Sequence, residues 1–332
     1  LMAAVPFRKA YWDDVASMSK DLVDAYLRQG NYVRVLKHER PEAVHLLLEH
    51  DHPWEAIQLL EMMLHQNQAP ELNLVKSALY LAARSSSFSV PRQDASFSVG
   101  NLLEFMESEA PNDSDLPDLE FQFFGFLHKH QPSTALYRHL CKNTDAFVSM
   151  IDAVCAIGES EEKEESSEKG RVYKRRAWNV LFFWPVLPGF QEDGSIDEEH
   201  LSNWVTGVRE KLKNSEHIEQ GDEYIGQVLS SSPKGSDGIW PAEEVRELIE
   251  TLANSTIDSN IVVGRLNQRD AATRGRFDGG TQERAVGRKY AEDAKRIATQ
   301  WPRTAAILRS ISDGYKFNGF FLDRRAEQMA DE

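Results

Sequence analysis

The sequence lacks most of the features that place a protein in a well-known functional class. Its 332 residues contain two cysteines, Cys141 and Cys155, which excludes a disulfide framework and a cysteine-rich zinc site. No apolar run approaches the roughly 18 residues of a membrane-spanning helix, and residues 1–12 lack the pattern of a signal peptide. These absences predict a cytoplasmic chain with no membrane partner.

Motifs that carry known chemistry are missing as well. The sequence has no H-E-x-x-H, C-x-x-C or G-x-S-x-G motif, no phosphate-binding loop and no kinase or deaminase signature. His45 and Glu49 are four residues apart, so on one helix face they could supply two ligands to a metal ion. The nearby histidines lie at a helix end, where the helix dipole favours a cation, so they need no metal to explain them. We therefore predict no catalytic residue, no cofactor and no metal site. An enzyme with an unrecognised site is the third hypothesis, and self-association through the apolar helices of the first half is the fourth.

The charge balance is strongly acidic. The chain has 53 acidic and 38 basic residues, a net charge of −15. Nucleic acids and anionic membranes would be repelled at long range, so general binding to either is disfavoured. A local basic patch remains compatible with this balance.

Helical periodicity dominates what is present. Residues 41–50 and 53–66 each begin with a proline, which favours the first turn of a helix, and residues 71–84 continue the pattern. Short helices with proline-marked connections are typical of antiparallel pairs stacked as in an α-solenoid. Since no repeat has a fixed period, we predict an all-α, irregular helical-repeat (α-solenoid-like) array followed by a second, C-terminal helical subdomain.

Further along the first half, residues 85–98 and 111–117 are predicted to be loops, and residues 121–130 a strongly apolar helix. The run at 158–170 contains six glutamates and almost nothing apolar. Such a segment cannot bury enough surface to offset its ordering entropy, which predicts a linker or loop. The expected domains are thus a helical-repeat subdomain at 1–157, the acidic linker or loop at 158–170, and a C-terminal helical subdomain at 171–332.

The second half begins with an aromatic-rich helix predicted within 172–190, which Pro185 and Pro188 terminate. Asp197 is a candidate N-cap for the next helix, whose apolar stripe consists of Leu201, Trp204, Val205, Val208 and Leu212. Further helices are predicted at 241–254, at 281–299 and from 302 onward, and residues 256–268 favour a helix over a short strand. Trp240 and Trp301 each precede a proline, so they are expected just outside their helices and packed in the core.

The least ordinary stretch is RDAATRGRFDGGTQER, residues 269–284. It belongs to a basic segment, 264–309, with eleven lysines or arginines against five acidic residues, a net charge of +6 inside an acidic protein. Backbone amides after glycines at a helix N-terminus can hold an anion, and arginine forks suit phosphate oxygens. The candidate contacts for an anion or a partner are Arg269, Arg274, Arg276, Gly279, Gly280, Arg284 and Arg288.

A plainer interpretation of the same stretch is structural. Gly279 and Gly280 would supply a turn into the next helix, Thr281 would cap it, and the arginines would pair with acids of neighbouring helices. The spacing matches neither a phosphate-binding loop nor a dinucleotide fingerprint. Both interpretations stay open from the sequence.

Three blocks of the sequence resemble the C-terminal region of long multidomain bacterial proteins of unknown function. They are EAVHLLLEHDHPWEAIQLLEMML, DEYIGQVLSSSPKGSDGIWPAEEVRELIETLA and GRFDGGTQERAVGRKYAEDAKRIATQWPRTAAILRSISDGY, in that order. Of the family pattern before the Gly-Gly pair, Asn267, Arg269, Arg274 and Gly275 match, whereas Asp270-Ala271 replaces Gly-Val. Gly314-Tyr315-Lys316 replaces Ser-Tyr-Glu, which calls the continuity of the final helix into question.

The resemblance implies a place in a larger bacterial protein, and the start at Leu1 rather than methionine also predicts an excised piece. The leading hypothesis is a non-catalytic helical interaction or scaffold module that contacts other domains of the parent protein or a protein partner. Such an architecture would suit a sensor or regulatory part of a conflict or defence system. The second hypothesis is nucleic-acid or phosphate binding through the Arg-rich segment 265–309.

Overall fold

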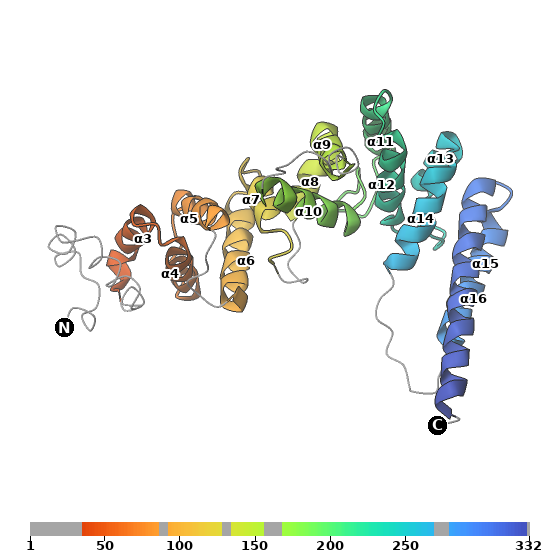
Figure 1. The fold of residues 1–332 in the computed structure, drawn as a ribbon. Helices are drawn as coiled ribbons and strands as arrows, with labels where there is room; N and C mark the ends of the chain where they lie inside the picture. Colours follow the sequence, from red (N-terminus) through yellow and green to blue (C-terminus); the bar gives the residue numbers. More distant parts are fainter. Residues whose placement is uncertain (1–34, 86–91, 128–133, 156–167, 269–278, 331–332) are drawn as a thin grey trace. The chain divides into compact units, whose positions relative to one another are not determined.

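The computed structural model describes residues 35–85, 92–127, 134–155, 168–268 and 279–330. The regular elements in these ranges are fourteen α-helices, α3 to α16, and one short 3-10 helix, η3 (Figure 1). Within them, strand-like pairing is limited to an isolated bridge between Phe190 and Ile196. The predicted all-α class is confirmed. None of the helices described combines the length and the apolar content needed to cross a membrane.

The chain divides into two compact units, Leu1–His139 and Leu140–Glu332. The division between His139 and Leu140 falls within the sequence of α8 (Thr134–Lys142). The acidic run at 158–170 falls inside the second unit: residues 156–167 lie outside the described ranges, and α10 begins at Glu168. The helices on either side of the run, α9 and α10, pack against each other.

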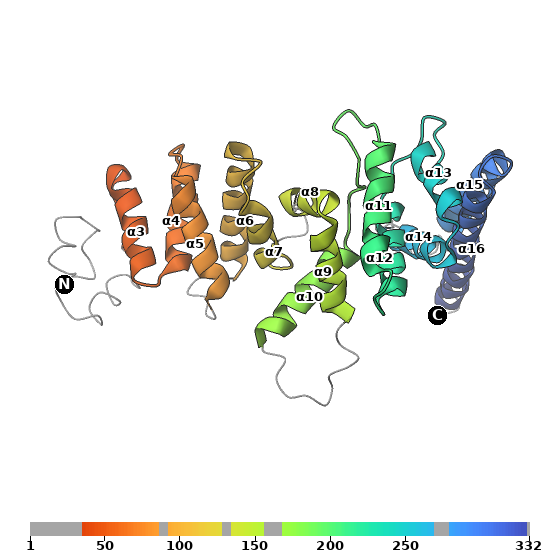
Figure 2. The ribbon, with the colours of Figure 1, turned by 90° about the horizontal axis from the view of Figure 1, so that it is seen from above.

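The helices of the first unit each pack on helices close to them in sequence, α3 on α4, α4 on α5 and α6, and α6 on α7 (Figure 2). Their bounds are Lys37–Glu39 for η3, Arg40–Glu49 for α3, Pro53–His65 for α4, Leu72–Arg84 for α5, Arg92–Glu109 for α6 and Leu116–Phe123 for α7. The helices predicted at 41–50, 53–66 and 71–84 are thus confirmed to within two residues, and prolines do occupy the first turns of α3 and α4.

Two predictions in this unit are wrong. Residues 92–98, predicted as loop, form the first turns of α6, because small side chains such as Ala95 and Ser96 are buried there and the Ser96 hydroxyl donates to the carbonyl of Phe126 at 2.8 Å. Of the helix predicted at 121–130, residues 121–123 form the end of α7, which starts at Leu116, residues 124–127 are not helical, and residues 128–130 lie outside the described residues. Gly125, with φ of +80°, turns the chain after α7.

A buried carboxylate links α7 to the start of α8. Glu120 is 4% exposed, and its Oε2 accepts the backbone N–H of Leu136 at 2.6 Å. Burial raises the pKa of Glu120 to about 7. The side chain satisfies an amide in the first turn of α8 that the helix itself leaves without a partner.

The second unit contains the remaining helices. Their bounds are Thr144–Cys155 for α9, Glu168–Phe182 for α10, Glu198–Leu212 for α11, Ile218–Ser230 for α12, Glu243–Leu252 for α13, Ser255–Asn267 for α14, Thr281–Ile297 for α15 and Pro302–Ala330 for α16. The Asp197 cap is confirmed, since its carboxylate accepts the N–H of His200 at 2.9 Å, and the whole predicted stripe of α11 is buried. Residues 255–267 form α14, so the helix that the sequence favoured over a short strand for residues 256–268 is confirmed.

An aromatic cluster joins the first turn of α9, the segment after α10 and the middle of α11. The ring of Phe147 lies 4.7 Å from that of Trp204 and 5.3 Å from that of Trp184, both nearly edge-on. The Trp204 indole donates to the carbonyl of Leu140 at 3.0 Å. These edge-on contacts hold Trp184, which lies two residues beyond the end of α10.

The last two helices form an antiparallel hairpin, and they lie side by side in Figures 1 and 2. Tyr315 of α16 stacks on Tyr290 of α15 at 5.8 Å, and the Ser312 hydroxyl donates to the carbonyl of Gly287 at 2.7 Å. Helix α16 runs without a break through Gly314. The departure from the family pattern at Gly314-Tyr315-Lys316 therefore does not interrupt it.

Candidate functional site

The residues predicted to contact an anion or a partner are only partly described by the structure. Arg269, Arg274 and Arg276 lie outside the described residues. Gly279 and Gly280 form the turn into α15, with Gly279 at φ of +55° and Gly280 at the N-cap, and Arg284 and Arg288 follow in the helix. Thr281 is the first residue of α15 rather than its cap.

At this turn a carboxylate of the chain itself occupies the helix N-terminus. The N–H of Gly280 donates to Asp323 Oδ1 at 2.8 Å, and the Arg284 guanidinium pairs with Oδ2 of the same side chain. The hydrogen bond from Gly280, with help from Arg284, lowers the pKa of Asp323 below its ordinary value. Sequence reasoning missed Asp323, because it lies on α16, far along the chain from the turn.

Several other cations of the basic segment also contact side chains of the second unit. The Arg265 guanidinium lies 4.8 Å above the ring of Trp240 and donates to the hydroxyl of Tyr290 at 2.9 Å. Arg303 pairs with Asp258 at 2.7 Å. A second group is exposed on the surface of α15 and α16, namely Arg288, Lys289, Lys295 and Arg309.

A different surface of the second unit carries exposed aromatic rings. Trp178, Phe182 and Phe183, at the end of α10, are 44%, 39% and 58% exposed. The rings of Trp178 and Phe182 stack at 4.9 Å with an interplanar angle of 16°. The sequence predicted an aromatic-rich helix here and assigned no function to it. We call these three residues the α10 aromatic face.

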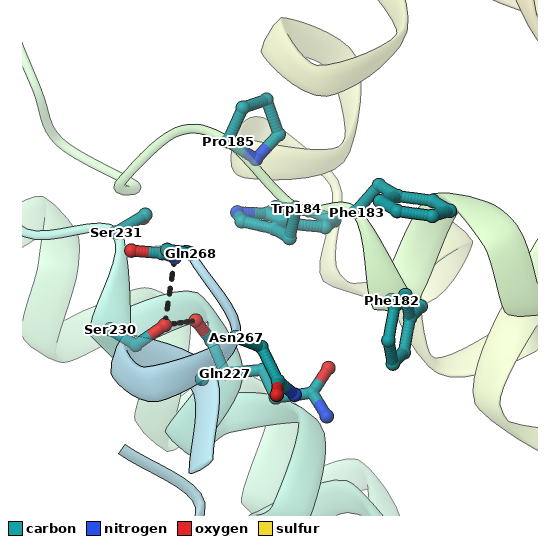
Figure 3. A pocket seen from close by; sticks show the side chains of 10 residues that line it. Phe182, Phe183, Trp184, Pro185, Gln227, Ser230, Ser231, Asn267 and Gln268 are labelled. Atoms are coloured by element: carbon teal, nitrogen blue, oxygen red, sulfur yellow. Dashed lines mark hydrogen bonds between the residues drawn. The ribbon is translucent and has the colours of Figure 1, made fainter. Parts of the chain in front are cut away.

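A cavity of about 300 Å³ adjoins the α10 aromatic face (Figure 3). Figure 3 shows the rings of Phe182, Phe183 and Trp184 on one side and hydroxyl and amide side chains from α12 and α14 on the other. The cavity is lined by Phe182, Phe183, Trp184, Pro185, Gln227, Ser230, Ser231, Gly264, Asn267 and Gln268. We call it the α10–α12–α14 pocket.

The polar side of this pocket is held by hydrogen bonds. The amide of Gln268 donates to the Ser230 hydroxyl at 2.9 Å, which in turn donates to the carbonyl of Gln227 at 2.6 Å (Figure 3). The Oε1 atom of Gln227 is buried and accepts no hydrogen bond. Gly264 permits this packing, since a Cβ there would lie 2.4 Å from the Ser230 hydroxyl.

The chemistry of the pocket suits binding rather than catalysis. Its ten lining residues include no charged, histidine or cysteine side chain, so no general acid or base faces either serine. Among the residues that the structure describes, no three side chains are grouped so as to hold a metal ion. The pocket can offer stacking surfaces and neutral hydrogen-bonding groups to a ligand.

The nature of the pocket explains why sequence reasoning did not find it. Its lining comes from segments far apart in the chain, the end of α10, the end of α12 and the end of α14. Each segment contributes common, uncharged residues without a motif. In comparisons with protein families, curated proteins and solved structures, no match to this chain is found.

Proposed function

We propose that the chain is a non-catalytic helical interaction module that binds another protein, or another domain of a larger bacterial protein, through the α10 aromatic face and the pocket beside it. The observation that carries this proposal is the exposure of Trp178, Phe182 and Phe183 next to an uncharged pocket. Aromatic residues are enriched where proteins bind one another, whereas charged residues are depleted at the centre of such surfaces.

The packing of the first unit supports a scaffold role. Each of its helices packs on near neighbours in sequence, as successive helices do in a solenoid. We propose that α3–α7 form an irregular α-solenoid-like array. A sensor or regulatory role in a conflict or defence system is part of the same proposal, and it rests on the resemblance to multidomain bacterial proteins.

The alternative proposal is nucleic-acid or phosphate binding through the Arg-rich segment 265–309. The exposed Arg288, Lys289 and Lys295 on α15 favour it, whereas the engagement of Gly280 and Arg284 by Asp323 leaves less of the helix N-terminus for an external anion. Binding of short DNA or RNA that weakens steeply as salt is raised would support this function. Binding that is absent or insensitive to salt would eliminate it.

A peptide-display selection against the full chain tests the leading proposal. We expect enrichment of peptides that carry apolar or aromatic side chains, because such groups can stack on the α10 aromatic face. Replacing Phe183 by serine should weaken the selected peptides about tenfold or more, as expected for an aromatic residue at the centre of an interface. Isothermal titration calorimetry would measure this change.

The matched control is Phe97→Ser on α6, since Phe97 is 52% exposed and belongs to the other unit. It should leave the peptide affinities unchanged. A selection that enriches no peptide, or an equal loss in the Phe183 and Phe97 variants, would contradict the proposal.

A further inference from the structure

A second aromatic surface lies on α16, on the side of the helix that faces away from α15. Phe317, Phe320 and Phe321 are 62%, 56% and 53% exposed. The inner side of the same helix is filled by residues such as Ile311, Ser312 and Tyr315, which are buried. At about 100° per residue, the three phenylalanines project opposite to this buried stripe. We call them the α16 aromatic face.

The α16 aromatic face is a compact cluster. The rings of Phe317 and Phe321 lie 4.7 Å apart and those of Phe320 and Phe321 6.0 Å apart, both edge-on. With about half of each side chain exposed, the face presents on the order of 300 Å² of apolar surface. The largest apolar patch on a typical monomer is of this size and is often functional.

The charges around this face bear on the kind of partner that fits it. Along the outer side of α16, Arg309, Asp313 and Lys316 precede the phenylalanines, and Arg324 and Glu327 follow them. Lys316 lies at the edge of this side, about 100° from the buried Tyr315, and pairs with Asp313 of its own helix at 2.8 Å. For the four charges Arg309, Asp313, Arg324 and Glu327, the order of signs is plus then minus before the rings and again plus then minus after them, which is complementary to itself when the helix is reversed. A parallel pairing in register would instead place each charge against its own copy.

We propose that α16 pairs antiparallel with α16 of a second copy of this chain. A two-fold axis between Asn318 and Gly319 brings Asp313 of one copy opposite Arg324 of the other and Phe317 opposite Phe320. Arg309 then lies beside Glu327 of the second copy. Self-complementarity of one patch is what a two-fold symmetric dimer requires.

The pairing uses groups that are accessible in the single chain. Asp313 is 73% exposed and contacts Lys316 on its own helix, and the Arg324 guanidinium lies 5.9 Å from the ring of Phe320. Because the apolar area is well below that of a permanent dimer, the association is weak and reversible. It involves a different surface from the α10 aromatic face and does not depend on the function proposed for that face.

Charge reversal on the full chain tests the pairing. Sedimentation velocity over a range of about 1 to 100 μM should show a reversible monomer–dimer equilibrium. Asp313→Arg and Arg324→Asp should each raise the dimer dissociation constant about tenfold, because like charges then meet at both ends of the interface. An equimolar mixture of the two variants should dimerise again, since a dimer with one copy of each variant places opposite charges against each other at both ends.

The control is Arg325→Asp, a charge reversal at an exposed position one residue further along, about 100° around the helix. It should leave the dissociation constant unchanged, and Phe317→Ser should raise it. The proposal is overturned if the unaltered chain sediments as a monomer throughout, if the mixture associates no better than the single variants, or if Arg325→Asp weakens association as much as Arg324→Asp.

Discussion

Replacement of Arg246 by alanine is expected to lower the free energy of unfolding of the second unit by about 3 kcal/mol or more. The Arg246 side chain is completely buried, at 0% exposure. Its guanidinium donates to both carboxylate oxygens of Asp237, at 2.8 and 2.9 Å, and its centre lies 4.8 Å from the ring of Trp301.

The same guanidinium holds the loop that precedes α13. It donates to the carbonyls of Pro241 at 2.6 Å and Ile239 at 2.7 Å. Alanine would leave these carbonyls without a donor in the interior and would open a cavity beneath Trp301. Each of these losses adds to that of the ion pair, which is why the expected cost exceeds that of a surface salt bridge.

Hydrogen exchange of the α13 and α16 amides, measured at increasing urea concentrations, gives the free energy of unfolding of the second unit alone. Arg296→Ala is the matched control, since Arg296 is 58% exposed and lies 3.5 Å from Asp293; it should cost well under about 1 kcal/mol. Arg246→Lys keeps the charge but loses the planar fork, so an intermediate loss is expected and a folded variant is retained for comparison. If Arg246→Ala lowered the free energy of unfolding by less than Arg296→Ala does, Arg246 would not be the stabilising buried residue inferred above.

The pH dependence gives a second check. Arg246 holds the pKa of Asp237 below its ordinary value, so the native pair contributes stability above the unfolded pKa of about 4 and loses it as pH falls through the lower folded pKa. The difference between the unaltered chain and Arg246→Ala should therefore shrink in acid.

The parts of the fold that could be predicted are those with a local cause. A proline in the first turn of α4 and the Asp197 carboxylate before α11 mark helix starts through their immediate neighbours, and the buried stripe of α11 follows from its own periodicity. The start of α6 could not be predicted, because Ser96 looks polar but is buried through a hydrogen bond to Phe126, thirty residues away.

The candidate sites were harder still to predict, because their residues come together only through contacts between distant parts of the chain. Arg246 lies in AEEVRELIE, where it resembles an ordinary surface arginine, and its burial depends on the loop folding over it. The α10–α12–α14 pocket has no sequence motif, since three distant segments supply it. The Gly279-Gly280 turn was predicted from local residues, but its partner Asp323 was not, because nothing nearby in the sequence indicates which carboxylate reaches it.

Substitution of Gly280 by alanine is expected to destabilise the α15–α16 hairpin by about 2–3 kcal/mol. A Cβ on Gly280 would lie 2.1 Å from the carbonyl oxygen of Gly319 and 2.4 Å from its Cα. These are backbone atoms of α16, so no side-chain rotation can relieve the clash. The start of α15 would have to move away from α16.

That movement would also break the contacts that fix the start of α15. The N–H of Gly280 donates to Asp323, and Arg284 pairs with the same carboxylate, so both interactions weaken as the backbones separate. Gly319→Ala tests the same contact more gently, because its Cβ would lie 3.2 Å from the carbonyl oxygen of Gly280. We therefore expect a smaller loss from Gly319→Ala than from Gly280→Ala.

Gly207→Ala on α11 is the control for adding a methyl group to a helical glycine. Its Cβ would meet Thr144 Cγ2 at an ordinary 3.5 Å, so alanine should leave stability unchanged or raise it by up to about 1 kcal/mol through helix propensity. Hydrogen exchange at the α15 amides measures all three variants. Protection of α15 in Gly280→Ala equal to that of the unaltered chain would show that the close approach at Gly319 does not set the packing of the hairpin. If protection falls as expected, the close approach of Gly280 and Gly319 holds α15 against the inner side of α16, which leaves the α16 aromatic face on the outer side.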